Sequence, residues 1–266
     1  MPTATVNDIE ITYELEGDGA ETIVLVNGLA DTLETWAFQM EALLDAGYRV
    51  LRFDNRGVGR SSKPAGPYTT AMFADDTKAL VDSLGIADFH LLGVSMGGMI
   101  AQEYAIANPG DLRSLILACT YATPGPFCSR MFSLWADMAP AMGVATVMRD
   151  VTLWAFTVPF FSEQTGMLAE FEADMASIDQ PLDAYLAQLS SIQTHDATDR
   201  LAAIDVPTLV LAGEQDILIP VSLSRELHAA IRGAEWATTP GGHACVWESP
   251  EPFNSAVTAF LSRVRV

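Results

Sequence analysis

Basic side chains are scarce in this chain of 266 residues. It has 14 Lys and Arg residues against 34 Asp and Glu residues, which gives a formal net charge of −20 at pH 7. A surface with this charge repels nucleic acid and anionic membranes, because both carry negative charge themselves. We therefore expect neither as a partner. The acidic composition also favours solubility, and it does not identify a substrate.

Cysteines are few as well. Cys119, Cys128 and Cys245 form neither a CxxC pair nor the spacing of a metal site, so we expect reduced thiols in a cytoplasmic protein. No basic region followed by an apolar stretch opens the sequence, and long apolar runs are missing, which predicts neither a secretion signal nor a membrane span. A His-x-x-x-His motif is also absent, and we expect no metal.

Apolar residues, by contrast, make up 50% of the sequence, enough for a large core. After an alternating segment over residues 3–15, continuous apolar runs typical of buried strands alternate with stretches of helical periodicity. This alternation predicts an α/β fold whose parallel sheet is covered by helices on both faces. The later expected strands are 22–26, 48–53, 89–92, 112–118, 208–212 and 234–238, and the expected helices include 35–46, 69–84, 98–105, 221–231 and 252–264.

The pattern changes after about residue 121. Strand-like runs disappear, and helical periodicity with many aromatic residues continues to about residue 200. We expect residues 1–121 and 201–266 to form an α/β core and residues 122–200 to form an inserted helical cap. Most of the cap's aromatic side chains must form its own core.

Residues 93–97, Gly-Val-Ser-Met-Gly, fit the nucleophile-elbow pattern Gly-x-Ser-x-Gly. A buried strand is expected before this segment and a helix after it, so the chain must turn sharply at Ser95. Gly93 and Gly97 leave room for the turn. The serine hydroxyl would then lie at the carboxyl edge of the sheet, near a helix N-terminus that favours negative charge. The alternative is a structural turn whose serine caps the helix.

A serine nucleophile needs a base, and histidine is the side chain with a suitable pKa. The sequence offers four. His243 lies in the glycine-rich loop 240–244 between the last strand and the last helix, where it can reach across the sheet edge. His90 is expected in the core, His195 in a polar stretch and His228 on the surface.

The base in turn needs an anionic partner. Asp216 follows the strand 208–212 and therefore lies at the same edge of the sheet as the elbow. Glu214 is the rival acid, and Asp196 and Asp199 are weaker candidates because they precede a strand. With Asp216, the chain order is serine, acid, histidine, the order of the α/β architecture.

An oxyanion formed at the serine requires preorganised N–H donors. We expect the backbone amide of Met96 to be one donor and that of Leu29, in the loop 27–30, to be the second. An ordinary strand-to-helix turn is the alternative for this loop.

The glycine-containing segment 54–61 lacks the spacing of a dinucleotide-binding loop. We expect Asp54 and Arg56 to brace the loops around the site. No cofactor is expected.

These motifs together resemble the α/β-hydrolase superfamily, and the resemblance covers the chain except for the cap. Among its subfamilies the sequence is most similar to the oxoadipate enol-lactonases and the aminoacrylate hydrolases. The resemblance implies an eight-stranded, mostly parallel sheet, a cap after the sixth strand and a cofactor-free serine mechanism. The sequence departs from many relatives at Asn27, where histidine is frequent, and at Ala30, where glycine is common; we expect both to affect pocket shape. The motifs are Asn27-Gly28-Leu29, Asp54-Asn55-Arg56-Gly57-x-Gly59-x-Ser61, Gly93-Val94-Ser95-Met96-Gly97-Gly98, Gly213-Glu214-Gln215-Asp216 and Gly242-His243.

Three functions are compatible with these residues. The first is hydrolysis of a small carboxylic ester or lactone through an acyl-serine intermediate, with Trp135, Trp154, Phe156 and Arg130 in the substrate pocket. The second keeps the catalytic residues but cleaves a small amide or a carbon–carbon bond, with an acid group of the substrate held by Arg130 or Arg149. The third is a non-catalytic receptor on the same fold. All three imply a small-molecule ligand, and a homo-oligomer is possible.

Overall fold

Eight strands form one sheet in a computed structural model that describes residues 1–265. Their order in the sheet is β1-β2-β4-β3-β5-β6-β7-β8. The pairs β1–β2 and β2–β4 are antiparallel, and the remaining neighbours are parallel, which confirms the predicted eight-stranded, mostly parallel sheet. The strands are β1 Thr3–Val6, β2 Ile9–Glu16, β3 Glu21–Val26, β4 Tyr48–Phe53, β5 Phe89–Val94, β6 Leu112–Ala118, β7 Thr208–Gly213 and β8 Glu235–Thr239.

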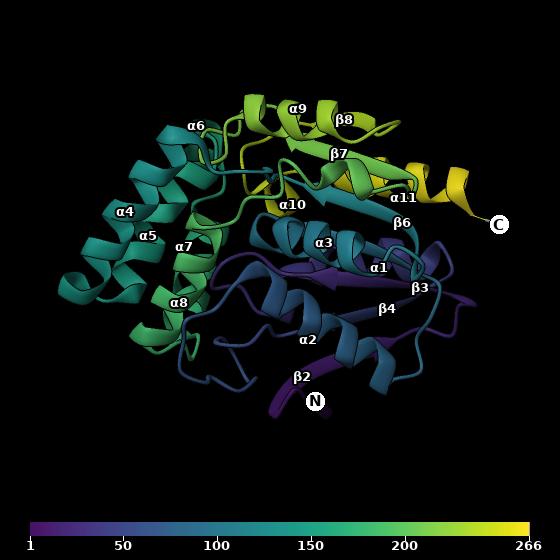
Figure 1. Cartoon of the computed structure of the whole chain (residues 1–266). Helices are drawn as coiled ribbons and strands as arrows, with labels where there is room; N and C mark the ends of the chain where they lie inside the picture. Colours follow the sequence, from purple (N-terminus) through teal and green to yellow (C-terminus); the bar gives the residue numbers. More distant parts are fainter. Residues whose placement is uncertain (266) are drawn as a thin grey trace.

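Helices cover both faces of this sheet (Figure 1). Along β3, Val24 belongs to the core shared with α2 and α3, whereas its neighbour Leu25 belongs to the core shared with α1 and α11. Because side chains alternate across a strand, a strand covered on both faces reads as a continuous apolar run. The helices outside the β6–β7 connection are η1 Leu33–Trp36, α1 Ala37–Asp45, α2 Thr70–Ser83, α3 Met96–Ala107, α9 Val221–Ala230, α10 Cys245–Glu248 and α11 Pro250–Val264.

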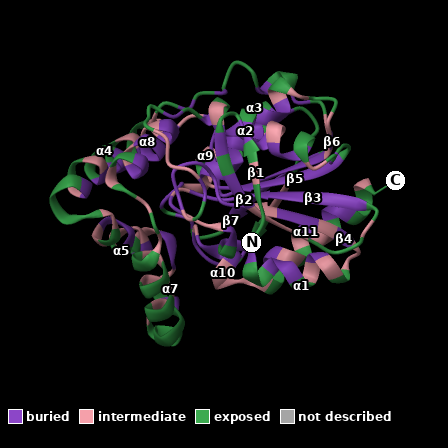
Figure 2. Cartoon of the chain, turned by 90° about the horizontal axis from the view of Figure 1, so that it is seen from below, coloured by how far each residue is buried: buried purple, intermediate pink, exposed green. Residues whose placement is uncertain are grey.

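The connection from β6 to β7 consists of helices that lie at one end of the sheet, on the left of Figure 1. Helix α7 has no buried residue and projects as a mostly exposed helix in Figure 2. The α-helices of this connection begin and end within the range predicted for the cap, 122–200. They are α4 Gly125–Met142, α5 Val144–Ala155, α6 Val158–Glu163, α7 Thr165–Ser177 and α8 Leu182–Gln193, followed by η2 Leu201–Ala203.

Differences from the predicted elements are confined to their ends and to short helices. The expected helix 35–46 begins with the 3₁₀ turn η1, and the short helix α10 was not predicted. Such short elements carry too few residues for a periodic signal. Among the helices of residues 1–265, none is long and apolar enough to cross a membrane.

The elbow between β5 and α3 has the strained backbone expected from its sequence. Ser95 adopts φ 54° and ψ −118°, a region that non-glycine residues rarely occupy. A Cβ atom on Gly97 would lie 2.0 Å from the carbonyl oxygen of Val26, and one on Gly93 would lie 2.1 Å from the carbonyl oxygen of Gly97. Only glycine therefore lets β3, β5 and α3 approach this closely.

Replacing Gly97 by alanine is expected to lower the free energy of unfolding by about 3 kcal/mol or more, because the added methyl group collides with backbone that cannot move aside. Urea unfolding followed by circular dichroism measures the change. Gly110→Ala is the matched control, since a Cβ atom at Gly110 meets nothing within 4 Å. Equal midpoints for the two variants would contradict the close backbone approach at the elbow as the reason for its glycines.

Candidate active site

Ser95 is fixed at the carboxyl end of β5 by the neighbouring strand. Its amide donates a hydrogen bond to the carbonyl oxygen of Ala118 at 2.9 Å, and Thr120 Oγ1 donates to the carbonyl oxygen of Ser95 at 2.8 Å. The Ser95 side chain makes no capping hydrogen bond to α3 within the described chain. The interpretation as a capping serine is therefore wrong, and the hydroxyl is available for other chemistry.

Asp216 and His243 form a hydrogen-bonded pair. His243 Nδ1 lies 2.8 Å from Asp216 Oδ2, and the amide of Ile219 donates to Asp216 Oδ1 at 2.8 Å. The side chains of Asp216 and His243 are 1% and 11% exposed. When the imidazole is neutral and Nδ1 donates to the carboxylate, Nε2 carries the lone pair and can accept a proton.

Two loops that cross at close range bring this pair together. A Cβ atom on Gly213, at the end of β7, would lie 2.0 Å from the carbonyl oxygen of Gly242, beside His243. The amide of Gln215 donates to the carbonyl oxygen of Gly241 at 2.9 Å. Glu214 is exposed between these contacts and accepts a hydrogen bond from Thr238 Oγ1 at 3.1 Å, so the rival acid points away from the histidine.

Ser95 and His243 line the same small, apolar cavity of about 60 Å³. No hydrogen bond joins the two side chains in the part of the chain that the structure describes. Catalytic hydrogen bonds are often long before a substrate binds. The cavity is lined further by aliphatic and aromatic side chains that include Leu29, Met99, Phe132, Trp135, Met148, Val151, Phe171, Ile192, Leu218 and Trp247.

Charges around His243 favour its protonated form. Burial alone lowers the pKa of the imidazolium, but the charge and hydrogen bond of Asp216 outweigh burial, with smaller contributions from Cys119 and Asp31, and the pKa rises to about 9. A resting imidazolium must therefore lose its proton before it can act as a base.

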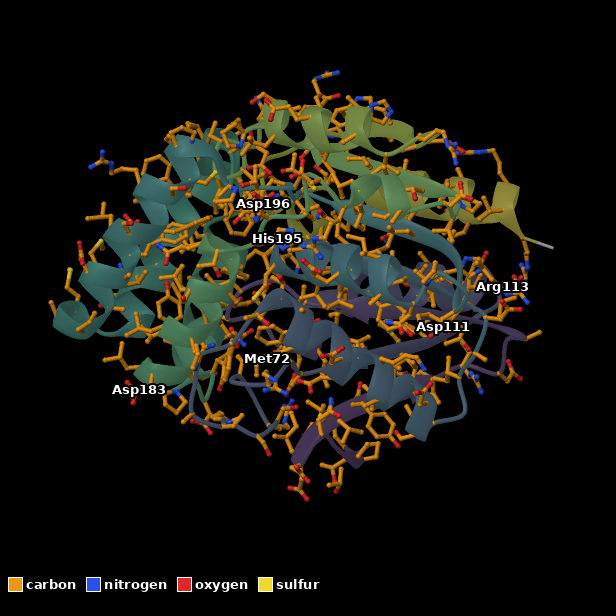
Figure 3. All side chains as sticks on the ribbon, viewed as in Figure 1. Met72, Asp111, Arg113, Asp183, His195 and Asp196 are labelled. Carbon is orange, nitrogen blue, oxygen red and sulfur yellow. The ribbon has the colours of Figure 1, made fainter. Side chains whose placement is uncertain are left out.

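The other histidines lie away from this cavity. His90 Nδ1 lies 2.8 Å from Ser114 Oγ, and His195 Nδ1 lies 3.0 Å from Thr70 Oγ1. Burial lowers the pKa of His90 and of His195 to about 4. His195, expected in a polar stretch, is buried against Thr70 of α2 and Glu103 of α3, next to the exposed Asp196 (Figure 3). His228, expected on the surface, is half-buried and bonded to the carbonyl oxygen of Ala234 at 3.0 Å.

The loop that follows β3 lies beside Ser95. Leu29 lines the cavity of Ser95, and Met96 is the buried first residue of α3. Ala30 has φ 62°, which explains why glycine suits this position, and its amide donates to Gln188 Oε1 at 3.1 Å. Gln188 Nε2 also donates to the carbonyl oxygen of Arg56 at 2.7 Å. Gln188 thus ties α8 to the loop, a role that no sequence pattern indicated.

Asn27 braces this loop from inside. Its Nδ2 donates to the carbonyl oxygen of Phe53, and its Oδ1 accepts from Trp36 Nε1, both at 2.7 Å. Asn27 is fully buried and lines neither the Ser95 cavity nor the larger cavity beside it. Asn27 therefore does not line the pocket, and any effect it has on pocket shape passes through the loop it braces.

Asp54 and Arg56 are structural, as predicted. Asp54 Oδ1 accepts from the amide of Leu33 and Oδ2 from the amide of Arg60, both at 2.8 Å. Arg56 donates to Asp76 Oδ1 at 2.6 Å in a buried ion pair. These contacts hold the loops after β4 against η1 and α2.

Two of the four predicted pocket residues lie elsewhere. Trp135 lines the Ser95 cavity and Phe156 lines the larger cavity beside it, but Trp154 packs on Phe127 and donates to Asp150, outside both. Arg130 is exposed, because the inner face of α4 is formed by its neighbours at helical spacing. Arg149 is also exposed and lies 3.6 Å from Glu172, so neither arginine can hold an acid group of a substrate in these cavities.

Asp31 is a cavity residue that the sequence patterns did not predict. It follows the loop 27–30 and lines the Ser95 cavity. Among the described residues that line this cavity, His243 is the only other one with a titratable side chain. Burial raises the pKa of Asp31 to about 7, against the opposing effects of the His243 charge and the Gly28 backbone. An acidic residue directly after the expected oxyanion loop was the available signal.

Comparisons with known proteins agree with this architecture. The family model for the alpha/beta hydrolase fold matches residues 21–250. A protein of Azorhizobium caulinodans named as carbamate hydrolase RutD is 31% identical over 265 residues, which cover 99% of each chain. The enol-lactonase from Burkholderia xenovorans LB400 shares 30% identity at a TM-score of 0.92 and covers 98% of this chain and 100% of its own. A thermophilic esterase from Thermogutta terrifontis, solved with malate bound, has 27% identity and a TM-score of 0.90 over 100% and 99% of the two chains. The sheet order, the elbow and these matches together show that the chain belongs to the α/β-hydrolase family.

Proposed function

We propose that this protein hydrolyses a small carboxylic ester or lactone through an acyl-enzyme on Ser95. The observation that carries the proposal is the shared cavity of Ser95 and His243, with His243 Nδ1 held 2.8 Å from Asp216 Oδ2. In this mechanism His243 Nε2 takes the hydroxyl proton as Ser95 attacks the carbonyl carbon, and it then protonates the leaving oxygen. Water repeats the sequence on the acyl-enzyme and releases the acid.

The strained elbow and the loop after β3 supply the rest of the proposed machinery. The amides of Met96 and Leu29 would stabilise the oxyanion of the tetrahedral intermediate, because Met96 follows Ser95 as the first residue of α3 and Leu29 lines the Ser95 cavity. Helices α4–α8 would act as the cap, since apolar side chains of α4, α5, α7 and α8 line the cavity. The small cavity of about 60 Å³ favours a short acyl group.

A carbamate or small amide is the second candidate. It is supported by the relatives named as carbamate hydrolase RutD, which match nearly the whole chain at 30–31% identity. The arginine-assisted version of this candidate, with an anionic substrate, loses its support because Arg130 and Arg149 lie outside the cavities. No observation favours the receptor hypothesis, which would leave the Asp216–His243 hydrogen bond and the shared cavity of Ser95 and His243 without a role.

A panel of chromogenic substrates tests the proposal. We expect kcat/KM for p-nitrophenyl acetate to exceed that for p-nitrophenyl octanoate at least about 10-fold, because the cavity excludes the long chain. We also expect it to exceed that for a matched p-nitroanilide and a matched N-methylcarbamate by at least about 100-fold. Faster turnover of the carbamate than of the ester would favour the second candidate, and no turnover of any substrate would contradict both.

A further inference from the structure

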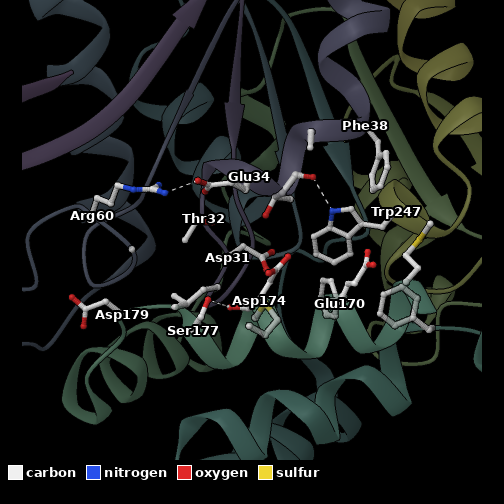
Figure 4. Close-up of a pocket in the computed structure, with 18 of the residues that line it drawn as sticks. Asp31, Thr32, Glu34, Phe38, Arg60, Glu170, Asp174, Ser177, Asp179 and Trp247 are labelled. Atoms are coloured by element: carbon white, nitrogen blue, oxygen red, sulfur yellow. Dashed lines mark hydrogen bonds and ion pairs between the residues drawn. The ribbon is translucent and has the colours of Figure 1, made fainter. Parts of the chain in front are cut away.

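Two cavities meet beside Ser95. The inner one is the small cavity that holds Ser95 and His243, and the outer one, of about 620 Å³, lies between η1 and α7 (Figure 4). Asp31, Phe171 and Trp247 line both, so they form the junction between them. A substrate whose carbonyl reaches Ser95 therefore has room for a second group at the junction and beyond it.

The Asp31 carboxylate lies at this junction on the side of Ser95. A Cβ atom on Gly28 would lie 2.6 Å from Asp31 Oδ2 and 3.6 Å from Ser95 Cβ, so both side chains approach the same face of Gly28. Basic side chains that could neutralise the Asp31 carboxylate lie only at longer range. Within residues 1–265, no nitrogen of a basic side chain lies within 4.0 Å of its oxygens.

Each basic side chain that lines the two cavities is already paired with another acidic residue. Arg60 lies 2.8 Å from Glu34, and His243 lies 2.8 Å from Asp216. The described lining of both cavities contains no other basic residue. Four more carboxylates line the outer cavity, from Glu34, Glu170, Asp174 and Asp179, and Figure 4 shows Asp31 and Asp174 turned toward one another.

Aromatic rings complete the junction. The ring centroids of Phe171 and Trp247 are 4.9 Å apart, and Trp247 is held by a hydrogen bond of 2.8 Å from its Nε1 to the carbonyl oxygen of Thr35. Aromatic faces attract cations, and the attraction grows when water is excluded. A carboxylate beside two aromatic rings is thus suited to an ammonium group.

An unneutralised Asp31 carboxylate also opposes the reaction. The tetrahedral intermediate places a negative charge on the substrate oxygen next to Ser95, and like charges repel more strongly in a dry cavity than in water. A cation of the substrate at the junction would neutralise the carboxylate and remove this repulsion. An anionic substrate would add to it.

Building on the proposed function, we propose that Asp31 determines specificity by selecting esters that carry an ammonium group at the junction, over neutral and anionic esters of the same shape. The cation lies between the Asp31 carboxylate and the rings of Phe171 and Trp247, while the ester carbonyl reaches Ser95. This assigns the outer cavity to the alcohol part of the substrate.

A pair of isosteric esters tests this assignment. Acetylcholine and 3,3-dimethylbutyl acetate differ only in a charged nitrogen that replaces a carbon atom. At pH 8 and low ionic strength we expect kcat/KM for the cationic ester to be at least about 10-fold higher, and the ratio should fall as salt is added. Asp31→Asn should reduce the ratio to about 2 or less. Asp18→Asn, an exposed aspartate in the β2–β3 turn, is the matched control for the change in net charge and should keep the wild-type ratio.

The corresponding alcohols give the same comparison by binding. Choline should inhibit hydrolysis of p-nitrophenyl acetate at a concentration at least about 10-fold lower than 3,3-dimethylbutanol does, and Asp31→Asn should remove the difference. Equal rates and equal inhibition for the two members of each pair in the wild type would overturn the inference. So would a preference for the cation that persists in Asp31→Asn. Failure of the wild type to hydrolyse p-nitrophenyl acetate at all would instead count against the proposed function itself.

Discussion

Replacing Ser95 by alanine is expected to lower kcat for p-nitrophenyl acetate by a factor on the order of 10⁴–10⁶, because no other group can form the acyl-enzyme. The backbone amides that would bind the oxyanion remain in the variant, so a small residual rate above that in buffer is expected. The measurement is steady-state hydrolysis with purified protein, corrected for the spontaneous reaction. The urea midpoint should change little, because alanine adds no atoms to the elbow.

Ser262→Ala provides the matched control. Ser262 lies exposed on α11, where its hydroxyl donates only to the carbonyl oxygen of Ala259. This variant should retain wild-type kcat and KM. Retention of more than about a tenth of the activity by Ser95→Ala would show that another residue or plain base catalysis is responsible for turnover.

Asp216→Asn is expected to reduce kcat/KM by a factor on the order of 10⁴, because an amide can neither fix the imidazole tautomer nor stabilise the imidazolium. The variant should also change the pH dependence. The wild-type pKa of His243 is about 9, and the base acts in its neutral form, so kcat/KM should rise with pH toward about 9. Removal of the Asp216 charge leaves burial to dominate, which lowers the pKa, and the residual activity should reach its plateau at a lower pH.

Glu214→Gln is the control for this variant, since Glu214 is two residues away, exposed and bonded to Thr238. Its rate and pH profile should match those of the wild type. A large loss in Glu214→Gln together with near-normal activity in Asp216→Asn would show that Glu214, and not Asp216, is the acid. An unchanged pH profile in Asp216→Asn would show that the Asp216 charge does not raise the pKa of His243.

The order of the segments in the chain and their local sequence patterns were sufficient to predict the sheet and the residues that lie at its carboxyl edge. Parallel strands bring their carboxyl ends to one rim, so polar residues just after β5, β7 and β8 had to meet there. The glycines of the elbow indicated the sharp turn at Ser95 because a side chain at either place would meet backbone. These inferences depend only on local sequence and on the topology of parallel sheets.

Residues of the inserted helices were harder to place. Arg130 adjoins Met131, which is on the buried face of α4. Because one residue turns a helix by about 100°, predicting the helix correctly did not show which face of it carries Arg130. Trp154 was misplaced for the same reason. Which helix face meets the sheet depends on packing between distant segments, which periodicity alone does not fix.

Asp31 and Gln188 escaped prediction for a different physical reason. Both act through contacts with distant segments, since Gln188 on α8 meets the backbone of Ala30 and Arg56, and Asp31 approaches the same face of Gly28 as Ser95 does. Contacts of this kind leave no spacing pattern in the chain, and the one sequence signal for Asp31 was its place directly after the loop 27–30. The determinants of substrate choice therefore lie in the part of the site that only the three-dimensional arrangement shows.

Labelling with a fluorophosphonate tests the central claim most directly, because this reagent phosphonylates an activated serine far faster than an ordinary hydroxyl group. Intact mass spectrometry of the wild type at pH 8 should show one phosphonyl group per chain, and peptide mapping should place it on Ser95. Ser95→Ala should stay unlabelled, and Asp216→Asn should react far more slowly. Labelling at any other residue, or an unmodified wild type after prolonged treatment, would contradict the assignment of Ser95, His243 and Asp216 as the working site.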